Sequence, residues 1–517
     1  MGLLSLPLSL VLFSHFSTFA PFSRRLILLH TRPLGSFLMD EIVVKIKKFL
    51  KVEIHFLGRS FMDLRGWSGG NMNENPFRGR KLDSITRRRF LWLLSMSAAG
   101  AAVGCATSPV TGRTQLMLVS EEEEIQIDRQ NAPFQFSADY GQLQDKALND
   151  YVREVGQNMV ARTHRTHMPY SFRGVNANYV NAYAFPGGSI ACTRGILLSL
   201  GNEAELAALL GHELGHVNAR HTAQQMSKGK LTNTIVGGFS VVAGAVAGGL
   251  GQIAGTLGSI SAGALLASYS RENEREADAL GMEYMVKTGY SSKGMVGLMD
   301  MLQNLSKSKP SAIEMMFATH PMSDERYQSA VKNSEKNYAS SQSLPLYRER
   351  YMDQTARLRA MKGAIEEMQK GEEEMARQNF GEAEGHLRNA LKQAPNDYAG
   401  LVMMATCQLV QKKPGEGLKY SEAAKAIYPQ EAQAYHLSGF AKLQTRDFAG
   451  AYQDFSTNEK VLPGNPNTAF FKGFSLEGMG KKPESAQEYH RYLQVVQEGK
   501  YAQHAYARLV EWGYYKR

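Results

Sequence analysis

Cysteine is scarce in this chain. Only Cys105, Cys192 and Cys407 occur among its 517 residues, too few for the disulfide framework of a small secreted protein. Cys192 and Cys407 lie far apart in the sequence, and we expect each to be a small buried residue rather than half of a bridge. The stability of the fold therefore has to come from its core and from any metal that it binds.

Excess positive charge is absent from most of the chain, although the formal net charge is +10. Residues 1–104 hold 15 of the 59 Lys and Arg and only 6 of the 49 Asp and Glu, which leaves the remainder at +1. No basic cluster with interleaved aromatic residues stands out in that remainder. The composition thus gives no support to nucleic-acid binding.

Charge of either sign is missing from residues 231–270, which consist largely of Gly, Ala, Ser and β-branched residues. Forty residues are enough for one membrane crossing, which takes about 20. Nine glycines, together with Asn233 and Gln252, make a poor spanning helix. We expect a closely packed helical hairpin that shields a cleft or touches a membrane surface, with a spanning segment as the alternative.

The run His212-Glu213-Leu214-Gly215-His216 has the pattern of a zinc-protease site. Residues 203–210 before it are strong helix formers with apolar positions at helical spacing, so we expect the run to be helical. On a helix, His212 and His216 lie one turn apart on one face, where both imidazoles can reach a single Zn²⁺. Glu213 projects about 100° around the helix, which suits a general base rather than a ligand.

Glu274 is the candidate for the third ligand, within the acidic stretch 270–278. Asp278 follows it by one helical turn, so both carboxylates can face the metal. We expect Glu274 to bind zinc and Asp278 to orient a ligating imidazole by accepting its other N–H. Glu272 and Glu276 should point away from the metal, on a solvated face.

Two further histidines are weaker candidates. His221 lies five residues past His216 and about 140° off its face, so we expect a surface or locally bonded histidine. His320 precedes Pro321 and therefore lies outside a regular helix. It is a possible fourth ligand that keeps the site latent, a possible contact to the transition-state oxyanion, or an ordinary loop histidine.

The runs 212–218 and 270–278 together resemble the gluzincin metallopeptidases, a family that includes HtpX and the CAAX prenyl endopeptidases. Shorter matches occur at residues 110–116, 181–188 and 319–321. Within the family, the chain is most similar to the periplasmic assembly-enhancing proteases, which join a zinc protease to tetratricopeptide repeats.

This resemblance implies that one Zn²⁺ per chain is bound by His212, His216 and Glu274. It implies further that Glu213 is the catalytic base and that Asp278 supports a ligand. All five positions carry the residue that the family's pattern requires, so an active peptidase is expected.

Extended chain is expected from Tyr183 to Thr193, with a turn at Pro186-Gly187-Gly188. By similarity to zincins, the second half of this segment is expected to be the edge strand that pairs with an extended substrate, through Ser189, Ile190, Ala191 and Cys192. An ordinary hairpin is the alternative. Because pairing between main chains is largely blind to side chains, such an enzyme would favour unfolded polypeptide.

The run Thr86-Arg87-Arg88-Arg89-Phe90-Leu91 resembles a twin-arginine export signal, and a short apolar region follows it. Ala102-Val103-Gly104-Cys105 is similar to a lipobox. We therefore expect export to the periplasm, lipidation of Cys105 and attachment to the outer membrane. A signal without lipidation is the alternative.

Residues 1–85 carry no pattern of a folded domain. We interpret them as a leader or an over-extended gene start, because Met62 and Met72 would each place the arginines at an ordinary distance from the start. An additional membrane anchor around residues 3–22 is the alternative.

A 34-residue period runs through the C-terminal part. Small residues recur at Gly371, Ala405, Gly439 and Gly473, and prolines at Pro395, Pro429 and Pro463. Small residues where two helices cross, with a proline that ends each unit, are typical of tetratricopeptide repeats. We predict four repeats over residues 364–499 and a capping helix over residues 501–512. Their aromatic residues can pack or contact a partner; the candidates are Tyr435, His436, Phe470 and Phe471.

The chain is thus predicted to be α+β and mainly helical, with a zincin-type domain that contains a small sheet, followed by an all-α solenoid. The expected divisions are an extension (1–85), a signal (86–104), a zinc metallopeptidase domain (105–330), a helical linker (331–363) and a repeat domain (364–517).

The expected function is that of a zinc endopeptidase of the bacterial envelope that cleaves unfolded or misassembled proteins, with outer-membrane protein quality control implied by the resemblance. Its partners would be polypeptide substrates, a protein bound to the repeats and the membrane through a lipid anchor, without nucleic acid. Two alternatives remain open. One is a repeat-based assembly chaperone with a latent zinc site, and the other is an integral-membrane protease similar to HtpX.

Overall fold

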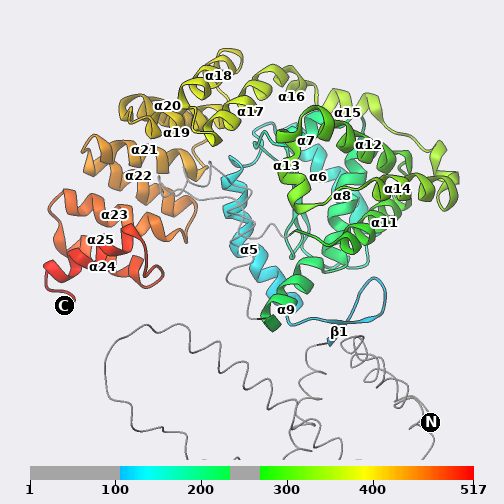
Figure 1. Cartoon of the computed structure of the whole chain (residues 1–517), viewed down its shortest axis with the longest axis horizontal. Coiled ribbons are helices and arrows are strands. Elements are labelled where there is room, and N and C mark those ends of the chain that lie inside the picture. The colour runs from blue at the N-terminus through cyan, green and yellow to red at the C-terminus, as the bar shows by residue number, and fades with distance from the viewer. Residues whose placement is uncertain (1–104, 233–267, 517) are drawn as a thin grey trace, which may run out of the picture. The chain divides into compact units, whose positions relative to one another are not determined.

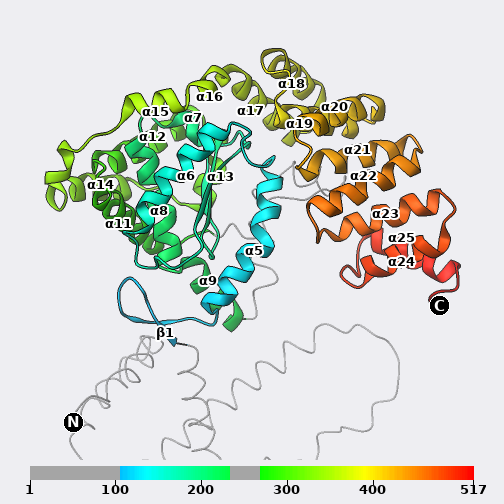
Figure 2. The ribbon, with the colours of Figure 1, turned by 180° about the vertical axis from the view of Figure 1, so that it is seen from behind.

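The computed structural model describes residues 105–232 and 268–516 (Figures 1 and 2). The predictions for the leader and signal, and for nearly all of the uncharged stretch 231–270, lie outside these residues. In the part that is described, no helix is both long and apolar enough to cross a bilayer.

The N-terminal part, residues 105–343, combines helices with two small sheets. Its elements are β1 (Cys105–Thr107), β2 (Thr114–Leu116), α5 (Glu121–Ala138), α6 (Lys146–Val160), β3 (Ser171–Val175), β4 (Ala182–Ala184), β5 (Ser189–Thr193), α7 (Arg194–Ser199), α8 (Glu203–Asn218), α9 (His221–Thr232), α11 (Arg271–Lys287), α12 (Lys293–Ser308), α13 (Pro310–Thr319), α14 (Asp324–Lys336) and the 3-10 helix η2 (Ala339–Ser343).

The larger sheet has the order β3-β5-β4. β5 pairs in parallel with β3, where Phe172 faces Ile190, and antiparallel with β4, where Tyr183 faces Ala191. The prediction that Ser189–Cys192 form an edge strand is therefore wrong. Both sides of β5 already have backbone partners, and Ile190, Ala191 and Cys192 are fully buried. In this sheet, β4 is the edge strand that lies next to β5.

Two helices of the N-terminal part, α8 and α11, pack unusually closely. A Cβ atom on Gly215 of α8 would lie 2.9 Å from the Cα of Ala277, and one on Gly281 of α11 would lie 2.7 Å from the backbone nitrogen of His212. Only small residues allow this approach. The glycine inside the histidine motif is therefore explained by helix packing rather than by chemistry.

The segment predicted as a linker is helical and packs onto the N-terminal part. It contains α15 (Arg348–Gln354) and α16 (Ala356–Ala360). Tyr351 is fully buried and donates a hydrogen bond from its hydroxyl to the backbone oxygen of Leu197, at 2.6 Å. This segment therefore contributes to the core of the N-terminal part.

The repeat part, residues 362–511, consists of antiparallel helix pairs and one final helix (Figure 1). Its helices are α17 (Lys362–Ala376), α18 (Phe380–Gln393), α19 (Tyr398–Val410), α20 (Pro414–Ile427), α21 (Ala432–Gln444), α22 (Phe448–Val461), α23 (Pro466–Gly478), α24 (Lys482–Leu493) and α25 (Lys500–Glu511). The period reflects packing, since a Cβ atom on Gly439 would lie 2.9 Å from the ring of Phe455.

Several side chains singled out in the sequence prove to be core residues. Cys192 and Cys407 are buried and unbridged. His436, Phe470 and Phe471 are nearly fully buried within the solenoid, so they pack rather than line a surface.

A buried ion pair joins the repeat part to the N-terminal part. Arg194, the first residue of α7, contacts Asp397 at 2.6 Å, and both side chains are less than 7% exposed. Asp397 is also the N-cap of α19, where it accepts a hydrogen bond from the backbone of Gly400. The guanidinium donates further to the side-chain oxygen of Asn178. The two parts are thus connected by a desolvated charge pair as well as by apolar contacts.

Removing one member of this pair should be costly. We expect Asp397→Asn to lower the free energy of unfolding by about 3–5 kcal/mol, because Arg194 would remain buried without its counter-charge. The exposed pair between Lys309 and Glu366 also links the two parts. Glu366→Gln, its matched control, should change stability by less than about 1 kcal/mol in urea denaturation. Equal effects of the two variants would contradict this.

Asp139, at the C-terminal end of α5, carries a buried carboxylate next to strand β4. It accepts hydrogen bonds from the hydroxyls of Tyr179 and Tyr183 and from the amide of Gln135. Burial raises its pKa to about 6, and the three hydrogen bonds offset part of this increase. Since the folded pKa exceeds the unfolded value of 3.8, its contribution to stability is present at low pH and is lost as pH rises through 6.

Asp139→Asn removes this titration. We therefore expect the free energy of unfolding of the wild type, relative to that of the variant, to fall by roughly 1–1.5 kcal/mol between pH 5 and pH 8. Asp300→Asn alters an exposed carboxylate on α12 and is the control. A pH-independent difference between wild type and Asp139→Asn, measured by denaturant titration at both pH values, would refute this assignment.

Candidate metal centre

Helix α8 positions the two histidines of the motif. It begins after Asn202, whose side chain caps the backbone N–H of Glu205, and acidic residues occupy its first turn as the helix dipole favours. His212 and His216 project from one face, with their Nε2 atoms 3.0 Å apart. Both imidazoles are almost completely buried.

Helix α11 supplies Glu274. Its start is set by a capping box between Ser270 and Asn273, which places Glu274 in the first turn. The carboxylate is fully buried, with Oε2 3.5 Å from Nε2 of His212 and Oε1 3.3 Å from Nε2 of His216. Donor groups of three side chains on two helices therefore converge on one point.

These donors fit a tetrahedral zinc ion. Ligands bound at 2.0–2.1 Å at tetrahedral angles are separated by roughly 3.3 Å, close to the three observed separations. With His320, the ligating atoms of four side chains all lie within 4.8 Å of one another. Two imidazoles and one carboxylate form the donor set of a catalytic zinc site, in which one position stays available for chemistry.

Two further side chains, those of Asp278 and Arg326, contact the metal donors His212 and Glu274. Asp278, one turn after Glu274, lies 2.8 Å from Nδ1 of His212. Arg326 of α14 contacts Glu274 at 2.7 Å and Asp278 through two nitrogens at 2.7 Å. Burial raises the pKa of Asp278, but Arg326 and His212 outweigh it and lower the pKa below its usual value. Asp278 thus contacts His212 and Arg326 in an ionised form.

Glu213 is placed as a base. It is fully buried beside His212, and among the residues that the structure describes neither of its carboxylate oxygens has a hydrogen-bond partner. Burial raises its pKa, while His320 and His212 partly offset this. A buried carboxylate with free lone pairs and a raised pKa is suited to accept a proton from water next to the metal donors.

His320 also enters the centre. It is the C-cap of α13, and its Nδ1 lies 3.3 Å from Nε2 of His212 and 3.2 Å from Oε1 of Glu274. Its Nε2 lies 3.8 Å from Glu213. Burial lowers its pKa, but Glu274 and Glu213 outweigh this and raise it. Of the roles left open for this residue, the geometry favours a contact with the metal donors.

Some residues of the centre were not predicted from the sequence. Arg326 was not identified, although two buried carboxylates one turn apart call for a cation. Glu276 was expected on a solvated face, but its carboxylate lies 3.2 Å from Nε2 of His221. His221 is fully buried.

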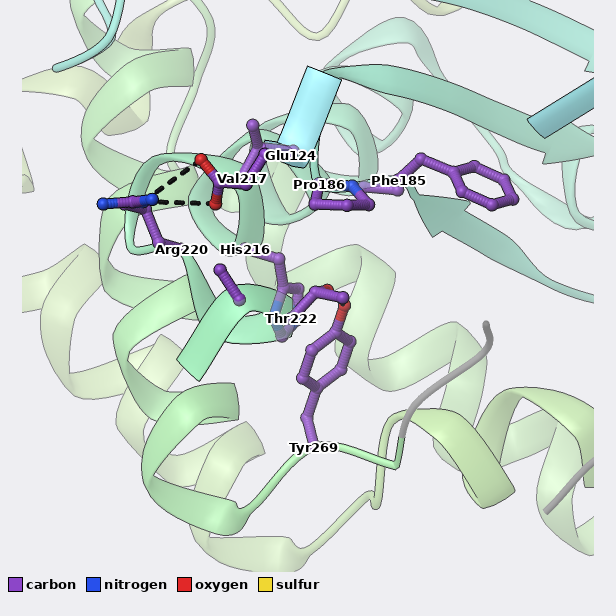
Figure 3. Close-up of a pocket in the computed structure, with 10 residues that line it drawn as sticks. Glu124, Phe185, Pro186, His216, Val217, Arg220, Thr222 and Tyr269 are labelled. Carbon is purple, nitrogen blue, oxygen red and sulfur yellow. Dashed lines mark hydrogen bonds and ion pairs between the residues drawn. The ribbon is translucent and has the colours of Figure 1, made fainter. Parts of the chain in front are cut away.

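A small hollow adjoins His216 (Figure 3). Its lining includes Ala184, Phe185 and Pro186, from the end of β4 and the turn after it, as well as Tyr269. The ring of Tyr269 stacks on His216 with 3.8 Å between centroids. The edge of the sheet and one metal donor, His216, thus border the same hollow.

Comparison with known proteins places this chain among peptidases. The sequence profile described as "Peptidase family M48" matches residues 146–334. A β-barrel assembly-enhancing protease of Yersinia pestis is 25% identical, over 63% of this chain and 71% of its own length. The protein of that name in Escherichia coli K12 is 27% identical, over 40% of this chain and only 45% of its own length.

A shorter relative, metalloprotease YcaL of Escherichia coli K12, is 31% identical, over 39% of this chain and 73% of its own length. Among solved structures, the tetratricopeptide-repeat protein YrrB matches 40% of this chain and 97% of its own at 13% identity, with a TM-score of 0.27 that is too low to carry an argument. The family profile, the relatives and the donor geometry agree, and the chain belongs to peptidase family M48.

Proposed function

We propose that this protein is a zinc-dependent endopeptidase of the bacterial cell envelope that cleaves unfolded or misassembled polypeptides. The observation that carries the proposal is the position of Glu213, a buried carboxylate beside three convergent metal donors, whose oxygens have no hydrogen-bond partner among the described residues. A purely structural zinc site has no use for such a base.

A zinc ion in this site supplies Lewis acidity, which polarises a peptide carbonyl and makes water a better nucleophile at neutral pH. Glu213 accepts the proton of the attacking water and delivers it to the leaving amine. Asp278 and Arg326 keep His212 and Glu274 in place throughout. The protein's contribution is thus proton transfer and rigid positioning.

The substrate is proposed to lie along β4 (Ala182–Ala184). This strand is at the edge of its sheet, and its end borders the same hollow as His216. An extended polypeptide that added a strand there would be held by main-chain hydrogen bonds next to the metal donors. Such binding selects unfolded chains rather than a particular sequence.

His320 is proposed to hold the centre latent in this conformation. Its Nδ1 faces the same point as the other three donors, so it competes for the position that water needs. Cleavage would then require His320 to withdraw. The alternative oxyanion role requires His320 to face the substrate carbonyl instead.

Three further parts of the proposal rest on the sequence and on the relatives. Lipidation of Cys105 would attach the protein to the outer membrane after export. Several relatives are named for the enhancement of β-barrel assembly. By analogy, we propose outer-membrane protein quality control as the setting and the repeat part as the place where a protein partner or client binds.

One other function is less well supported. An assembly chaperone with an inert zinc site would not need the carboxylate of Glu213, which has no hydrogen-bond partner among the described residues. The alternative of an integral-membrane enzyme depends on the uncharged stretch 231–270, nearly all of which lies outside the described residues.

Glu213→Gln should abolish proteolysis without loss of the metal. We expect cleavage of unfolded casein to fall by roughly 10²–10⁴-fold, because the amide cannot accept the proton of water. Zinc content should remain near one per chain, and Glu314→Gln, at an exposed position of α13, should be as active as the wild type. Equal cleavage by wild type and Glu213→Gln would rule out the proposed mechanism.

His320→Ala should increase basal proteolysis. Because a competing side chain is removed, we expect casein cleavage to rise roughly tenfold. His167→Ala, at a side chain that is 62% exposed, serves as the control. A fall of about 10²-fold in kcat would instead assign His320 to the oxyanion and contradict latency.

A further inference from the structure

The turn between α8 and α9 brings the buried side chain of His221 next to the metal donor His216. Helix α8 ends at Asn218, and Arg220 adopts a left-handed backbone with φ of 60°, which is unfavourable for a residue with a side chain. Arg220 is held there by Glu124 at 3.1 Å and by the backbone oxygen of Val119 at 2.8 Å (Figure 3). The chain turns here, and α9 begins at His221, whose ring contacts that of His216.

His221 lies between a metal donor and a carboxylate. Its Nδ1 is 2.9 Å from Nδ1 of His216, and its Nε2 is 3.2 Å from Oε2 of Glu276. His221 and His216 are both essentially inaccessible to solvent, whereas Glu276 is partly exposed at the end of the series. The three side chains form one hydrogen-bonded series from the surface to the metal donors.

The order of protons along this series follows from the chemistry of imidazole. If Nε2 of His216 binds a metal, its lone pair is used there and Nδ1 carries the proton. Nδ1 of His221 then has to accept that hydrogen bond, which leaves the proton of His221 on Nε2. The carboxylate of Glu276 can only accept, so it receives this last hydrogen bond. Each hydrogen bond of the series therefore has only one possible donor and one possible acceptor.

We propose that His221 and Glu276 are positioning residues that hold His216 in the tautomer and ring orientation needed to bind zinc. This inference rests on the zinc site of the proposed function. Asp278 is placed to do the same for His212 directly, through its contact with Nδ1. Helix α11 would thus carry one ligand, Glu274, and the outer carboxylate for each imidazole, which is Asp278 beside His212 and Glu276 beyond His221.

The test is the zinc affinity of purified full-length variants, measured by competition with a chelating dye. His221→Phe removes the acceptor while it preserves most of the volume, and we expect affinity to fall about 10–100-fold. His221→Asn restores a carbonyl near the position of Nδ1 and should lie within roughly threefold of the wild type. Glu276→Gln should fall between them, because it loses only the charge-assisted part of its hydrogen bond.

Glu272→Gln is the matched control, because this glutamate is exposed on α11 one turn before Glu276. It should bind zinc as tightly as the wild type. The melting temperature of the metal-free protein should shift equally in His221→Phe and His221→Asn, which separates positioning from a general loss of structure.

Unchanged zinc affinity in both His221→Phe and Glu276→Gln would overturn the inference. Equal losses of affinity in His221→Phe and His221→Asn would also overturn it, since the restored acceptor would then have no effect. The zinc affinity can be measured whether or not the protein cleaves casein. If the wild type binds zinc but does not cleave casein, the proposed function fails while the positioning role is still measured.

Discussion

The centre depends on the close contact between α8 and α11. Gly211 and Gly215 on α8 lie one turn apart, and they face Ala277 and Gly281, which are similarly spaced on α11. This arrangement brings the two backbones near enough for the short side chain of Glu274 to reach imidazoles on the other helix. Larger residues at these positions would separate the helices by more than the tolerance of a metal site, which is about 0.2 Å in ligand distance.

Charge balance imposes the second constraint. The carboxylates of Glu213 and Glu274 are fully buried, that of Asp278 is 14% exposed, and Arg326 supplies one compensating cation. An excess of buried negative charge is costly unless further positive charge is present. A divalent ion between His212, His216 and Glu274 would meet this need. The raised pKa of His320 has the same origin, because the neighbouring carboxylates favour its protonated form.

Local patterns predicted much of this arrangement. The spacing of His212 and His216, and of Glu274 and Asp278, depends only on helical geometry, and the helices place these side chains together. The 34-residue period reflects contacts within each helix pair, such as Gly439 against Phe455.

Contacts between residues far apart in the sequence were harder to predict. Strand order depends on register between distant segments, and for this reason β5 was mistaken for an edge strand. Arg194 and Asp397 are 203 residues apart, so no local pattern marks them as partners. The role of His221 was hidden because it requires the left-handed turn at Arg220, a conformation that few residues other than glycine adopt.

The metal centre is tested most directly by an anomalous-difference map collected at the zinc absorption edge from crystals of the purified protein. A single strong peak is expected within about 2.0–2.2 Å of Nε2 of His212, Nε2 of His216 and a carboxylate oxygen of Glu274. A peak elsewhere, or no peak from protein purified in the presence of zinc, would contradict it.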